Sequence, residues 1–102
     1  MAPRLELHNL LKEIVGPNGK VYFQPPANVQ MEYPCIVYNR DSAFTRFAGN
    51  KLYRYHKRYQ VTVIDRNPDS EIPDKVIALP LASFERWFAA DNLNHDVFTI
   101  YF

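Results

Sequence analysis

The sequence predicts an α+β domain in which two helices pack on a mostly antiparallel sheet of about five strands. Helix-like and strand-like segments follow one another in the order α-β-β-β-α-β-β. Aromatic residues make up 15% of the chain, a content typical of folded, strand-rich proteins. The 102 residues, 47% hydrophobic and 23% charged, suit one soluble domain with one core. Residues 1–102 are therefore treated as a single domain.

Two segments have helical patterns. The first spans residues 4–15, where apolar residues recur at spacings of three and four and form one stripe: Leu7, Leu10, Leu11, Ile14 and Val15. Gly16 and Pro17 end it, because Gly tolerates a left-handed cap and Pro cannot continue a helix. The second spans about residues 71–79, with acidic residues at its positive end and Pro80 after it.

The first three predicted strands span residues 20–24, 35–42 and 53–65, with a loop at residues 43–51 between the second and third. In the third, Tyr and Val alternate with Arg, His, Gln and Thr, which predicts one buried and one wet face. Its length of roughly 43 Å, at about 3.3 Å per residue, exceeds what a domain of this size covers from centre to edge. The hairpin of the second and third strands is therefore predicted to project beyond the core.

The last two strands are predicted to form a hairpin. Residues 83–89 fit both helical spacing and strand alternation, and we interpret them as a strand. A turn at residues 91–94 then leads into a final strand at residues 96–102.

The formal net charge of +1 hides an uneven distribution. Residues 1–39 are neutral, residues 40–64 carry a net +5, and residues 65–102 carry a net −4. These charges are either the solvated faces of strands and turns, or complementary surfaces through which a basic hairpin meets the acidic region of the next copy. Binding of single-stranded nucleic acid is a weaker interpretation, because the tyrosines and the cations mostly occupy opposite strand faces.

No motif for catalysis or for a cofactor is found, and we expect neither an enzyme nor a bound metal. Residues 65–76 have part of the spacing of a calcium loop, but Ser70 and Val76 stand where Gly and Glu are needed. The three histidines lack cysteine partners at zinc spacing and are expected to be plain polar residues. Cys35, the single cysteine, is expected to be a small buried residue. Neither a secretory signal nor a membrane-spanning run is visible, so we expect a cytosolic origin.

Four segments, taken in chain order, are similar to one known family. They are the opening helix, residues 33–38 (YPCIVY), residues 58–75 (RYQVTVIDRNPDSEIPDK) and residues 90–102 (ADNLNHDVFTIYF). These segments resemble the tail-terminator proteins of long-tailed bacteriophages, also known as tail-completion or head-tail joining proteins.

The resemblance implies a virion structural protein of the siphophage neck, assembled in the host cytoplasm. Such proteins form a hexameric ring that caps the head-proximal end of the tail tube, ends tube polymerisation and joins tail to head. The implied partners are further copies of the chain, the tail tube protein and a head-side connector or stopper protein. DNA would pass through the lumen without specific binding, and no membrane is involved.

Within this framework, a first set of residues is expected at the subunit contact. The basic members, Arg54, Lys57 and Arg58, would pair with the acidic members, Asp69, Glu71 and Asp74. The basic set is expected to face a neighbour or the tube, because cations on the lumen would hold DNA.

A second set belongs to the loop at residues 43–51 and is expected to contact the tube or the connector. It comprises Phe44, Arg46, Phe47 and Lys51. Two Phe in an otherwise polar loop indicate either a patch to be covered or packing onto the domain's own core. The alternative functions are a head-side connector or stopper of the neck, and a small module that binds single-stranded nucleic acid.

Overall fold

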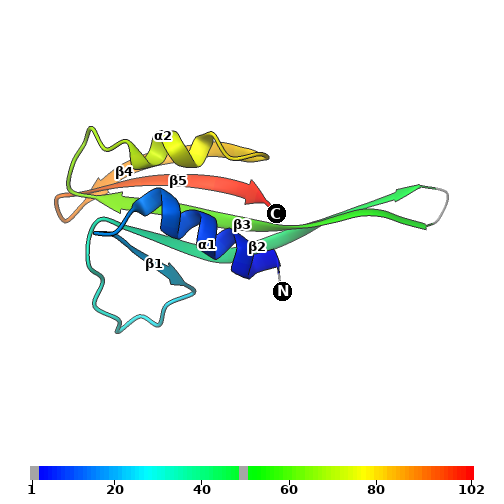
Figure 1. Cartoon of the computed structure of the whole chain (residues 1–102), viewed down its shortest axis with the longest axis horizontal. Helices are drawn as coiled ribbons and strands as arrows, with labels where there is room; N and C mark the ends of the chain where they lie inside the picture. Colours follow the sequence, from blue (N-terminus) through cyan, green and yellow to red (C-terminus); the bar gives the residue numbers. More distant parts are fainter. Residues whose placement is uncertain (1–2, 49–50) are drawn as a thin grey trace.

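One five-stranded sheet runs through the molecule, and both helices lie on the same face of it (Figure 1). The computed structural model describes residues 3–48 and 51–102, and it describes side chains within residues 4–41 and 57–102. Helix α1 (Pro3–Val15) contacts β1 and β2, and helix α2 (Ile72–Ile77) contacts β4 and β5. The two helices also touch each other, so they form one layer over the sheet.

The strands are β1 (Lys20–Phe23), β2 (Cys35–Ala48), β3 (Lys51–Asp65), β4 (Ala82–Ala90) and β5 (Leu93–Tyr101). They lie in the order β1-β2-β3-β5-β4, and β1 runs parallel to β2 whereas the other neighbouring pairs are antiparallel. The sheet is therefore mixed, which corrects the fold-class prediction. The physical reason is the segment 24–34, which carries the chain back along the sheet so that Cys35 starts beside Lys20.

The loop predicted after a short second strand, at residues 43–51, requires a second correction, because residues 43–48 and Lys51 belong to paired strands. Strand β2 continues to Ala48 and β3 begins at Lys51, and the two remain paired to that point. Beyond the Arg58–Tyr101 pair, β3 no longer has β5 beside it. Residues 42–48 and 51–57, hereafter the arm, extend from the rest of the molecule as a two-stranded ribbon (Figure 1). The molecule is accordingly elongated, at 51 × 23 × 23 Å.

The main core lies between the helices and the sheet. Leu7 and Leu11 of the predicted helical stripe are fully buried there, and Leu10 remains 36% exposed. Strand β3 shows the predicted alternation between residues 59 and 63: the odd-numbered residues are buried and the even-numbered ones are half-buried. The other buried members come from several elements: Val15, Ile36, Tyr38, Val76, Phe98 and Ile100.

A second, smaller cluster occupies the opposite face of the sheet. Cys35, Ile64 and Leu93 are buried there, beside the partly buried side chains of Tyr22, Met31, Tyr33 and Val37. The predicted burial of Cys35 is confirmed, and burial raises the pKa of its thiol to about 12. The segment between β1 and β2 thus covers a part of the sheet that the helices do not reach.

The interpretation of residues 83–89 as a strand is confirmed by β4. Between β4 and β5, Asp91 and Asn92 have φ angles of 54° and 63°. Two consecutive residues with positive φ suit a two-residue hairpin turn, and Asn and Asp tolerate this conformation well. Neither α1 nor α2, the helices in the described part of the chain, is long and apolar enough to cross a membrane.

Candidate assembly interface

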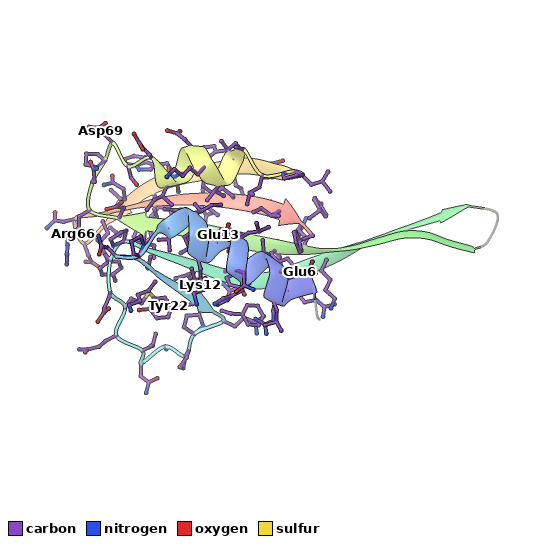
Figure 2. All side chains as sticks on the ribbon, in the orientation of Figure 1. Glu6, Lys12, Glu13, Tyr22, Arg66 and Asp69 are labelled. Atoms are coloured by element: carbon purple, nitrogen blue, oxygen red, sulfur yellow. The ribbon has the colours of Figure 1, made fainter. Side chains whose placement is uncertain are left out.

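The arm and the acidic turn after β3 lie at opposite ends of the molecule. Figure 2 places Asp69 at the end away from the arm. Residues 42–58 hold five cations and no carboxylate, whereas residues 69–96 hold six carboxylates and two cations. Among the described side chains, the basic and the acidic members of the predicted subunit contact form no ion pair with each other within one chain. They could therefore pair only between copies.

The root of the arm is fastened by the end of the chain. The Lys57 N–H donates to the Phe102 carbonyl at 3.3 Å, and the Phe102 N–H donates to the Lys57 carbonyl at 2.9 Å. Nε of Arg58 lies 3.0 Å from Oδ2 of Asp41. Hydrogen bonding to Tyr101 and the nearby Asp41 charge raise the pKa of the Arg58 guanidinium. Part of the Arg58 charge is thus balanced within its own chain, and Lys57 is the better candidate for a contact with another copy.

The other proposed arm residues occupy β2 and β3, but their side chains lie outside the described residues. They are Phe44, Arg46, Phe47, Lys51 and Arg54. The structure corrects their setting, because they belong to paired strands rather than to a loop.

The acidic end is built from a turn that its own side chains hold. The Asn67 N–H donates to Oδ1 of Asp65, and the Asp69 N–H donates to Oδ1 of Asn67, both at 3.0 Å. These are Asx turns, in which a side-chain oxygen bonds the backbone two residues further on. Within the described side chains, no group of three or more His, Cys, Asp or Glu could hold a metal.

The three acidic residues expected at the contact are exposed to solvent. Asp69 lies in the turn, Glu71 is the N-cap residue of α2, and Asp74 lies in the first turn of that helix. Among the described residues, none of these three carboxylates forms an ion pair or a hydrogen bond from its side chain. They are therefore available to cations from outside the chain.

A further carboxylate extends the acidic region towards β4. Asp96 lines a small hollow with Asp74, Ile77 and Phe84. Burial and, to a smaller extent, the charge of Asp74 raise the pKa of Asp96. Asp96 thus lies close enough to Asp74 for the two carboxylates to repel each other.

A polar cluster on the first two turns of α1 was not predicted from the sequence. The hydroxyl oxygen of the buried Tyr38 lies 2.7 Å from Nδ1 of His8 and accepts a hydrogen bond from Arg4 at 3.3 Å. An arginine only donates, so the Tyr38 proton is left for Nδ1 of His8. Burial, followed by the charges of Lys12 and Arg4, lowers the pKa of His8. His8 is therefore a structural partner of Tyr38 and not a plain surface residue.

The exposure of β4 was not predicted from the sequence either. Phe84, Trp87 and Phe88 are 53%, 56% and 38% exposed, and residues 83–90 are exposed throughout. The alternation that predicts a strand at residues 83–89 does not reveal whether that strand lies inside a sheet or at its edge. This strand lies at the edge.

No protein-family model matches the chain, and no curated protein matches it. Three features of the structure bear on function: the elongated shape, the charged ends and the exposed strand β4.

Proposed function

We propose that the protein is a bacteriophage structural subunit that forms a ring on the head-proximal end of the tail tube. The ring ends tube polymerisation and joins the tail to the head. The observation that carries the proposal is the separation of charge: a basic arm at one end of the chain and unpaired carboxylates at the other. Complementary surfaces at opposite ends associate head to tail, and such contacts either close into rings or continue as filaments.

The arm supports the proposal independently of its charge. Beyond the backbone bonds between Lys57 and Phe102, the described strands β2 and β3 pair only with each other. A two-stranded ribbon alone is marginally stable in water, because it has no third strand or helix to cover a face. Contact with another molecule would supply the missing cover.

The resemblance of the sequence to phage tail terminators supplies the remaining details of the proposal. It supports a ring of six copies, a tube protein below it and a connector above it. The basic arm would face a neighbouring copy or the tube, and the lumen would be left without a ring of cations that retards DNA. A head-side connector or stopper would have the same charged ends but different neighbours.

A second candidate is a module for single-stranded nucleic acid. The observation that favours it is the arm itself, in which cations and aromatic residues are interleaved and carboxylates are absent. This candidate leaves the exposed acidic end without a role, and we therefore place it second.

Mass measurement together with DNA retention distinguishes the two candidates. Light scattering after gel filtration should give a discrete species near six times the 12.0 kDa chain mass, without salt-dependent retention on single-stranded DNA. A monomer that binds single strands with a steep salt dependence would contradict the ring and favour the nucleic-acid module. Co-assembly with purified tail tube protein then distinguishes a terminator from a connector, since only the terminator should stop tube growth.

A further inference from the structure

The outer edge of β4 has the properties of a strand-docking surface. In the described sheet, β4 pairs only with β5, so its other edge presents unpaired backbone groups. Natural proteins protect such edges with Lys, Pro, bulges or short strands. Strand β4 has nine residues, or about 30 Å at roughly 3.3 Å each, without Lys or Pro. Its protective features are the irregularity between Phe84 and Arg86 and the two charged residues there, Glu85 and Arg86, which leave residues 87–90 uncharged.

The opposite edge of the sheet provides a comparison. Strand β1 has only four residues, and Lys20 at its start forms an ion pair with Glu32 at 4.0 Å. A short edge with charge beside it is a poor template for another strand. The longer, aromatic edge is therefore the one suited to a partner.

We propose that the β4 edge receives the arm of a second copy as an added strand, so that one sheet continues from subunit to subunit. This inference rests on the proposed ring and names its contact. Strand addition of this kind supplies backbone hydrogen bonds for affinity, and side chains on the docking strand supply specificity.

Charge favours the arm as the occupant. The region around β4 is acidic on balance, because its carboxylates outnumber the cations Lys75 and Arg86. The carboxylates are Asp74 on α2, Glu85 in the strand, Asp91 after it and Asp96 opposite Trp87. The arm and its root hold five cations and no carboxylate. An arm seated on β4 would place these cations among the carboxylates, whereas a second β4 edge would bring like charges together.

Length and composition favour the β2 side of the arm as the added strand. Residues 42–48 span roughly 23 Å and would fit within β4. They contain one cation, Arg46, whereas residues 51–57 contain three. Charged edges resist pairing, so the less charged strand is the better donor of backbone hydrogen bonds. Strand β2 also has no outer neighbour beyond the Phe23–Tyr38 pair.

Trp87 permits a direct test, because it is the only tryptophan in the chain and is 56% exposed. Its emission should shift to shorter wavelength as the protein concentration rises and copies associate, and high salt should reverse the shift. Arg46→Glu should abolish the shift at concentrations where wild-type protein shows it. Lys12→Glu, the same charge change on the exposed face of α1, should leave the shift intact.

The outcomes separate this inference from the proposed function. A hexamer whose Trp87 emission does not change overturns the strand contact and leaves the ring. A monomer at every concentration contradicts the ring and the contact together. A shift that occurs only after tail tube protein is added assigns β4 to that protein and overturns the inference.

Cross-linking provides a second readout that does not require Arg46→Glu to fold. Cys35 is buried, so introduced cysteines are the reactive ones. Thr45→Cys on the arm and Ala89→Cys on β4, made in separate chains and mixed, should join into a dimer with a short bismaleimide. Thr45→Cys mixed with Asn9→Cys, an exposed position on α1, should not. Equal yields in the two mixtures would contradict the proposed contact.

Discussion

Strands β2 and β3 are stabilised differently at their two ends, although each is continuous in the chain. Near Ile36 and Val61 they are packed under helices and lie in the middle of the sheet, and both side chains are fully buried. Beyond Lys57, which bonds Phe102, the described parts of the same strands continue as the arm and pair only with each other. One strand pair thus forms part of the core of the domain and also an extension that lacks the cover of the helices and of β5.

Two substitutions to alanine, one in the core and one in the arm, test this difference most strongly. Ile36→Ala should lower the free energy of unfolding of the monomer by about 2–5 kcal/mol, because it removes a buried side chain and leaves a cavity. Leu52→Ala, in the arm, should change it by less than about 0.5 kcal/mol, the range of surface substitutions. Urea unfolding at high salt, where copies are separated, measures both. Comparable losses from the two variants would contradict a monomer whose arm lies outside the cooperative core.

The Arg4–His8–Tyr38 cluster joins α1 to β2 shortly before β2 enters the arm. Because the folded protein lowers the pKa of His8, the unfolded chain binds a proton more readily near the ordinary pKa of 6.5. The contribution of neutral His8 to the free energy of unfolding is therefore fully present above pH 6.5, and it is lost as pH falls from there towards the folded pKa. We expect thermal unfolding at lower temperature at pH 5 than at pH 7.5.

His8→Gln should flatten this pH dependence, and Lys12→Gln, on the same helix but exposed, should change it less. Scans across the pH range, made at high salt, would provide the comparison. A His8→Gln profile as steep as that of the wild type would show that the cluster does not carry the effect.

The elements of the core could be predicted from the sequence, because its patterns report local geometry. The stripe through Leu7 and Leu11 identified the helix, and the alternation at residues 59–63 identified the buried face of β3. The parallel pairing of β1 with β2 could not be predicted, since it depends on where the segment 24–34 returns the chain. Periodicity also gave no information on which strand ends the sheet, so the exposed aromatics of β4 were not anticipated.

The candidate site could be predicted only in part from the sequence, for a related reason. The uneven charge along the chain indicated a basic and an acidic region, and the structure places Asp69 of the acidic region at the end away from the arm. The sequence did not reveal that Arg58 has Asp41 beside it or that Tyr38 engages His8. Such pairings join residues that are distant in the chain, and they depend on strand register and helix placement.

The central claim, that the basic end of one copy meets the acidic end of the next, is tested most directly by a charge exchange. Lys57→Glu is preferred over a change at Arg58, which would also break the pair with Asp41. The mass of each variant should be measured by sedimentation at equal concentration and moderate salt, with Lys12→Glu as the control for net charge. We expect Lys57→Glu to weaken assembly severalfold, and Lys57→Glu combined with Glu71→Lys in the same chain to restore part of it. Assembly of Lys57→Glu that equals wild type, or a combined variant no better than the single one, would contradict the claim.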